Sequence, residues 1–178
     1  MNVRHSMPGA RFVAGAILAG SIALGAWPAA AVGADTTSGT GPTARLGTTR
    51  IELSDVARFH CHDRDYPIIQ CFVSTAELLA DENQTRIASA VTPDLVSAYV
   101  RWYRDPGYTG PSFDAFLSTP DLRTIGWDNM ISSFTPLNGG HPTWWAGPNR
   151  TGTKWDWGTA SVSALGSAND QISSAYRP

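Results

Sequence analysis

The sequence predicts a mainly β protein in which residues 97–178 form a double Greek-key β-sandwich, preceded by a small disulfide-containing segment with one helix. Three observations indicate this fold: a hexapeptide pattern that occurs twice, an aromatic and glycine-rich block upstream of each copy, and period-2 alternation before the first block. A repeat of about 40 residues has room for four strands of ordinary length. Two such repeats, about 97–136 and 137–178, make a sandwich with Greek-key connections.

The repeated pattern consists of two Asp or Asn residues, two variable positions and two serines. The first hexapeptide is 128–133 and the second is 169–174, so the copies lie 169 − 128 = 41 residues apart. Carboxylate, amide and hydroxyl oxygens are the hard donors that Ca²⁺ prefers. The pattern therefore indicates a calcium site in each repeat. The alternative is that Asn, Asp and Ser cluster in turns and caps only for local hydrogen bonding.

The upstream blocks are residues 103–110 and 145–152, which lie 145 − 103 = 42 residues apart. Each contains an aromatic residue, a turn with Pro and Gly, and a Thr-Gly pair. Apolar and polar positions alternate through Val100 and Trp102, which predicts a half-buried strand. Residues 143–145 also favour a strand. Because Pro fixes φ and Gly permits positive φ, a hairpin turn is expected after each strand.

This combination resembles the Greek-key motif of the βγ-crystallin family: an aromatic, four residues, an aromatic, one residue and Gly, and then the hexapeptide. The first repeat matches fully, at Tyr103, Tyr108 and Gly110. The second repeat matches at Trp145 and Gly152, but Arg150 stands where the second aromatic belongs. The resemblance covers residues 97–178 and implies a double Greek-key domain.

For the microbial members of this family, the resemblance implies two bound Ca²⁺ ions. Each hexapeptide would supply the carbonyl of its third residue and the hydroxyl of its fifth, which are Met130 and Ser132, then Gln171 and Ser173. The candidate side chains that complete or support the sites are Asp128, Asn129, Asn169 and Asp170. The hairpin of one repeat would lend a carbonyl to the site on the other, which suggests Asp105 and Gly147. With one carboxylate in each hexapeptide, we expect weak binding, near the 10⁻⁴–10⁻³ M range of extracellular modules.

The first 34 residues are predicted to be a secretory signal peptide. Arg4 and Arg11 precede or begin an apolar run over 12–26, and small residues at 32–34 fit a cleavage site. No later stretch is predicted to cross a membrane, so we expect a secreted, extracellular protein. Residues 35–49 are rich in Thr, Gly and Ser and are predicted to form a flexible leader.

Residues 50–92 are predicted to form a disulfide loop followed by a helix. Cys61 and Cys71 are the only cysteines, and a disulfide between them is expected in an exported chain. Ser74 and Glu77 fit a capping box, with an apolar stripe at Leu78, Leu79 and Ile87 and with the acidic residues on the solvent side. So small a segment makes a poor independent core, so the helix is expected to cover a sheet or cap a strand edge.

His60 and His62 beside Cys61 raise the alternative of a transition-metal site. A third ligand at suitable spacing is missing, and we interpret this stretch as a polar disulfide loop.

Charge and motifs exclude several classes of function. Without the first 34 residues the chain has 13 − 2 = 11 basic and 15 acidic residues, a net charge of −4 with no basic stripe, which argues against nucleic acid. No catalytic motif is present, so we predict a non-enzymatic calcium-binding protein whose fold Ca²⁺ stabilises. The alternatives are a protease inhibitor or toxin of the same fold, and a carbohydrate-binding face built on tryptophans. The tryptophans are Trp144, Trp145, Trp155 and Trp157, for which core packing is the preferred interpretation. A protein or polysaccharide partner is left open.

Overall fold

The computed structural model describes residues 41–89 and 97–177, with the side chains of 86–89 outside the description. The predicted signal peptide and the first part of the predicted leader therefore lie outside the described residues. Within the described ranges, no helix has both the length and the apolar character needed to cross a membrane.

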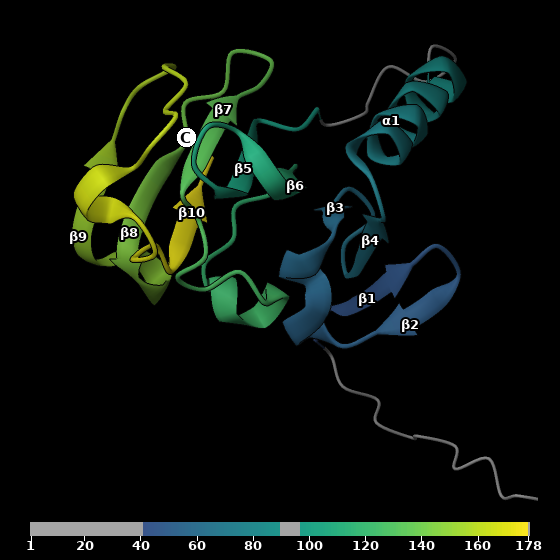
Figure 1. Ribbon diagram of the computed structural model, residues 1–178, viewed down its shortest axis with the longest axis horizontal. Coiled ribbons are helices and arrows are strands. Elements are labelled where there is room, and N and C mark those ends of the chain that lie inside the picture. Colours follow the sequence, from purple (N-terminus) through teal and green to yellow (C-terminus); the bar gives the residue numbers. More distant parts are fainter. Residues whose placement is uncertain (1–40, 90–96, 178) are drawn as a thin grey trace, which may run out of the picture. The chain divides into compact units, whose positions relative to one another are not determined.

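The strands form two sheets (Figure 1). The larger has the order β2-β1-β4-β3-β6-β5-β7 and the smaller has the order β10-β8-β9. The bounds of the larger sheet are β1 Thr43–Leu46, β2 Thr49–Ile51, β3 His60–His62, β4 Ile68–Phe72, β5 Val100–Asp105, β6 Thr109–Ala115 and β7 Ser133–Pro136. Those of the smaller sheet are β8 Thr143–Gly147, β9 Thr151–Asp156 and β10 Ser174–Tyr176. The strands predicted at Val100 and at 143–145 are confirmed as β5 and β8.

Helical elements connect these strands. The α-helix α1 is Thr75–Ser89, and the short 3-10 helices are η1 Leu53–Arg58, η2 Leu122–Ile125, η3 Pro148–Arg150 and η4 Gly166–Ala168.

The N-terminal segment extends the sheet of the first repeat. Strand β3 pairs in parallel with β6, with His60 opposite Ser112 and His62 opposite Asp114. Strand β1 pairs in parallel with β4. The pairing with β3 covers the side of β6 that would otherwise be an open sheet edge. The expected edge cap is thus made by strands rather than by the helix. Residues 43–49 are strand and turn instead of a flexible leader, because β1 pairs with β4 on one side and with β2 on the other.

The two repeats exchange a stretch of chain. Thr119, in the first repeat, and Ala175, in the second, donate to each other's carbonyls at 2.8 and 3.0 Å. Phe134 and Val162 make the equivalent pair in the other direction at 3.0 and 2.9 Å. Each sheet therefore includes a short segment of the other repeat, which is the crossing of a Greek key.

Aromatic side chains from both repeats fill the core. Trp102 stacks on Phe113 with ring centroids 4.9 Å apart, and Trp144 lies 4.9 Å from Phe134. Trp155 and Trp157 pack against this core while partly buried. Trp145 is on the opposite face of β8 from Trp144 and contacts Tyr176 at 5.3 Å. Three of the four clustered tryptophans therefore pack in or against the core, as the preferred interpretation expects.

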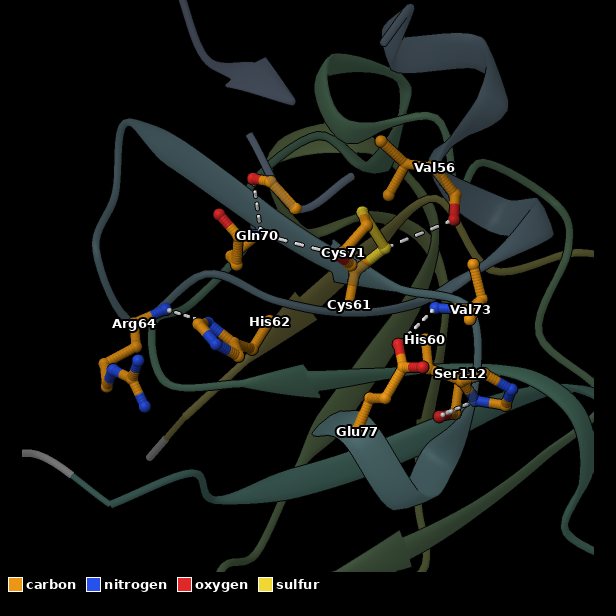
Figure 2. Close-up of a disulfide and its surroundings, with 11 residues drawn as sticks. Val56, His60, Cys61, His62, Arg64, Gln70, Cys71, Val73, Glu77 and Ser112 are labelled. Atoms are coloured by element: carbon orange, nitrogen blue, oxygen red, sulfur yellow. Dashed lines mark hydrogen bonds between the residues drawn. A yellow bond between two sulfur atoms is a disulfide. The ribbon is translucent and has the colours of Figure 1, made fainter. Parts of the chain in front are cut away.

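The predicted disulfide is present between Cys61 on β3 and Cys71 on β4 (Figure 2). The two residues are direct cross-strand partners and both are fully buried. The bond therefore ties β4 to β3, the strand that joins the N-terminal segment to β6.

Helix α1 begins as predicted but faces the sheet differently. The Glu77 amide donates to Ser74 Oγ at 3.3 Å and the Val73 amide donates to Glu77 Oε2 at 3.2 Å, so both partners of the predicted capping box act at the helix start. Leu78 is buried, but Leu79 is 41% exposed. The prediction that the acids face solvent is wrong for Asp81, because Arg64 and His62 offer partners on the sheet side.

Candidate cation site

The two hexapeptides have the same backbone conformation. Their second residues, Asn129 and Asp170, have φ of 55° and 52°. Asn and Asp are the non-glycine residues that tolerate this left-handed region best. The turn therefore explains part of the repeated pattern without reference to a ligand.

Reciprocal hydrogen bonds bring the two hexapeptides together. The Asn129 amide donates to the Ile172 carbonyl at 3.0 Å, and the Asp170 amide donates to the Ile131 carbonyl at 3.3 Å. Each turn therefore lies beside the fourth residue of the other hexapeptide. Spacing in the sequence indicated a duplication but did not predict this contact between the copies.

The side chains at this junction orient their oxygens. Asn129 Nδ2 donates to Asp128 Oδ2 at 3.2 Å, which leaves Asn129 Oδ1 3.5 Å from Ser173 Oγ. This distance is the upper limit for a hydrogen bond. It is also a normal spacing for neighbouring oxygens that share a Ca²⁺ at 2.3–2.6 Å. Asn169 Nδ2 likewise donates to Asp170 Oδ2 at 2.7 Å, so the amide-to-carboxylate pairing recurs in the second hexapeptide.

One carboxylate oxygen at the junction has no donor. Asp128 Oδ1 is buried and makes no hydrogen bond with the described residues. A charged oxygen removed from water without a partner is costly, and a bound cation relieves that cost. Ser132 and Ser173 are also largely buried, at 4% and 6% exposure. The donor set therefore fits a hard cation.

The predicted carbonyl ligands fall into two groups. No hydrogen bond from a described residue reaches the carbonyl of Met130 or Gln171. The carbonyls of Asp105 and Gly147, in contrast, each accept from the last serine of the hexapeptide in their own repeat, at 2.7 Å. The hairpins touch the opposite repeat through their amides: Gly107 donates to Ser163 and Asn149 donates to Pro120, each at 2.7 Å.

Arg150 preserves the hairpin in which it replaces an aromatic residue. Arg150 and Tyr108 both have a φ of 63°. The Tyr108 ring packs edge-on against Tyr103 at 5.9 Å. In the second repeat the Arg150 guanidinium lies 4.0 Å from the Tyr176 ring centroid and 5.8 Å from that of Trp145. A cation–π contact therefore replaces the aromatic pair.

The second repeat thus reproduces the strand, hairpin, turn and exchanged segment of the first. Residues 97–177 form a βγ-crystallin-like double Greek key.

The Cys61 segment is outside this unit. Among the described residues, no group of three or more His, Cys, Asp or Glu side chains is placed to hold a metal, so the transition-metal alternative at His60 and His62 gains no third ligand.

Solved βγ-crystallin domains are similar to this double Greek key. One from an archaeon is 28% identical, covers 46% of this chain and 99% of its own, and has a TM-score of 0.41. The domain from Clostridium beijerinckii is 25% identical over 44% of this chain and 95% of its own, with a TM-score of 0.41. The domain from Flavobacterium johnsoniae is 24% identical over 45% and 93%, also with a TM-score of 0.41. No protein-family model and no curated relative match the sequence.

Proposed function

We propose that this protein binds two Ca²⁺ ions at the junction of its hexapeptides and that calcium stabilises the double Greek key. The observation that carries the proposal is the buried Asp128 Oδ1, which has no donor among the described residues. It lies in the same hexapeptide as Asn129, whose side-chain oxygen approaches Ser173 of the other repeat at 3.5 Å. Oxygens from both repeats that could bind a cation therefore meet at one place.

The first site would use oxygens of Asp128, Asn129 and Ser173. The repeat relationship assigns the second site to Asn169, Asp170 and Ser132, and the Asp170 amide already contacts Ile131 next to Ser132. The carbonyls of Met130 and Gln171 are the first candidates to complete the two shells. The carbonyls of Asp105 and Gly147 already accept one hydrogen bond each and retain a second lone pair.

Bound calcium would act on stability through its charge and its position between the repeats. It would neutralise one carboxylate in each site. It would also bind oxygens from both repeats, and these oxygens separate when the repeats come apart. A ligand at 100 times its dissociation constant adds about 2.7 kcal/mol to the free energy of unfolding. A low charge count predicts weak sites, which suits the calcium level outside cells. Export and a non-enzymatic role are part of this proposal.

Thermal unfolding of the chain with increasing Ca²⁺ tests the proposal. We expect the melting temperature to rise through the millimolar range, and to rise less with Mg²⁺, which demands a tighter octahedral shell. Asp128→Asn should reduce the calcium response because it removes the charge and keeps one oxygen. Asp55→Asn makes the same change in η1, at an exposed ion pair with Arg58, and should respond like the parent.

A melting temperature that does not change in millimolar calcium would contradict the proposal. The inhibitor, toxin and carbohydrate-binding alternatives stay predictions, to be tested with a protease panel and a glycan-binding assay.

A further inference from the structure

The face that α1 presents to the sheet is mostly polar. Thr75, Leu78, Asp81 and Glu82 lie at the three- and four-residue spacing of one helix face. Of these, Leu78 is the apolar one, and it is fully buried. Thr75 Oγ1 lies 3.2 Å from His60 Nδ1. The same His60 nitrogen lies 3.0 Å from Ser112 Oγ (Figure 2). The helix is therefore held to β3 by a polar contact as well as by the packing of Leu78, and His60 continues this contact to β6.

Glu82 and Asp114 compete for one guanidinium. Arg101 on β5 donates through both Nε and Nη2 to the two oxygens of Asp114 on β6, whose side chain is fully buried. The same Nη2 lies 3.7 Å from Glu82 Oε2. The other Glu82 oxygen, Oε1, is buried and has no hydrogen-bond partner among the described residues. A Glu82 carboxylate in this position would carry a buried negative charge that shares its nearest guanidinium with Asp114. A neutral carboxylic acid carries no charge that needs a positive partner.

Among the described residues, the surrounding side chains do not provide a free positive charge that could pair with Glu82. The groups nearby are His60 and His62 on β3, Asp63, Arg64 and Asp65 after it, Arg101 and Tyr103 on β5, Asp114 on β6, and Asp81 on α1. Burial, together with Arg64, lowers the pKa of His62 and keeps it neutral near pH 7. Arg64 is engaged by Asp81 at 2.8 Å and lies 3.5 Å from Asp65. Carboxyl groups therefore outnumber the two guanidiniums.

We propose that Glu82 carries a proton when α1 is docked on the sheet, and that loss of this proton releases the helix. Docking then depends on pH with a defined sign. Burial, with Asp114 next, raises the pKa of Glu82 from 4.5 to about 8. Because the pKa of Glu82 is higher in the docked state, its protonation stabilises docking fully at pH values below the pKa of the undocked residue. This stabilisation is lost as the pH rises through the pKa of the docked residue. His62 and Asp81 act in the opposite direction, because their pKa values are lowered and their contribution is lost on acidification.

Hydrogen exchange of the α1 backbone in the full chain tests this switch. Protection factors, corrected for intrinsic exchange and compared with those of β8, are measured between pH 5.5 and 8.5. We expect the relative protection of α1 to fall at least about tenfold in the parent, since one proton separates the two states. Glu82→Gln imitates the protonated acid and should hold the protection within about twofold over the same range. Glu77→Gln is the matched control, because it changes an exposed carboxylate on the same helix and should keep the parent's pH dependence.

Protection that does not vary with pH in the parent, or a parent-like pH dependence in Glu82→Gln, would overturn the proposal. A ¹³C NMR titration of the Glu82 carboxyl in the unaltered chain does not depend on the variants. A midpoint near 8 supports the switch, and a midpoint near the ordinary 4.5 overturns it.

Discussion

Ser133 and Ser174 make the same two hydrogen bonds in the two repeats. Each hydroxyl donates to a hairpin carbonyl at 2.7 Å, that of Asp105 or of Gly147. Each also accepts a backbone amide of the same hairpin, from Tyr108 at 3.1 Å or from Arg150 at 3.4 Å. The last serine of the pattern is therefore a structural tether, whereas the serine before it is a candidate ligand.

Removing one tether should destabilise the domain without removing an oxygen that is proposed to bind the cation. For Ser133→Ala we expect a loss of about 1–3 kcal/mol, because a hairpin carbonyl and a hairpin amide, in part-buried hydrogen bonds, both lose their partner. Ser161→Ala, at an exposed serine, should change stability by less than about 0.5 kcal/mol. Urea unfolding monitored by tryptophan fluorescence measures both. Equal midpoints for the two variants would show that the tether contributes nothing.

Gly126 tests the contact between the N-terminal segment and the first repeat. It has a φ of 71°, and an added Cβ would lie 1.9 Å from the Leu53 carbonyl oxygen in η1. Gly139 has a φ of 73° with open space around the same position. Gly139→Ala should therefore cost about 1–2 kcal/mol from conformation alone, and Gly126→Ala clearly more. Equal losses in urea unfolding would contradict the packing of η1 against Gly126.

The disulfide should stabilise the junction of β3 and β4. The bonded cysteines are 10 residues apart, and the chain-entropy model credits a ring of this size with about 3 kcal/mol. We expect a loss of that order in the Cys61→Ala, Cys71→Ala double variant. The parent, unfolded and refolded under reducing conditions, should show a similar loss. An unchanged urea midpoint in both would show that strand pairing alone holds this segment.

Asp63 should make stability decrease between mildly acidic and mildly alkaline pH. Burial raises its pKa from 3.8 to about 7, although Oδ1 accepts the Phe116 amide at 2.7 Å. The contribution of Asp63 to the free energy of unfolding is complete below the pKa that this residue has in the unfolded chain. It is lost as the pH rises through the folded-state pKa of about 7. Asp63→Asn keeps an acceptor for Phe116 and should flatten the fall in unfolding free energy between pH 5 and pH 8.

Asp65→Asn, at an exposed carboxylate two residues further on, is the control and should keep the parent's slope. Glu82 acts in the same direction as Asp63, so the slope should become smaller in Asp63→Asn without vanishing. Identical slopes in parent and Asp63→Asn would show that Asp63 titrates normally.

The double Greek key could be predicted because its signals are local and occur twice. The turn residues, the paired serines and the aromatic blocks each specify a short conformation, and the copies support each other. The pairing of β3 with β6 could not be predicted in this way. It joins His60 to Ser112 over 52 residues through a three-residue strand, which is too short to show a period.

The candidate site was predictable as a set of residues but not as an arrangement. Residue types identified the oxygens, whereas the reciprocal contacts of Asn129 and Asp170 arise from the crossing of the two repeats. The acids of α1 were misplaced for a related reason. A hydropathy pattern assigns Asp81 and Glu82 to solvent, and only the fold shows that Arg64 and Arg101 lie opposite them.

Calorimetric titration of the chain with Ca²⁺ tests the central claim most directly. The parent should show two weak sites, and the Ser132→Ala, Ser173→Ala double variant should show none. A control with Ser161→Ala and Ser167→Ala removes two exposed serines and should bind like the parent. Binding that is unchanged in the Ser132 and Ser173 variant, or no binding in the parent, would contradict a calcium site between the hexapeptides.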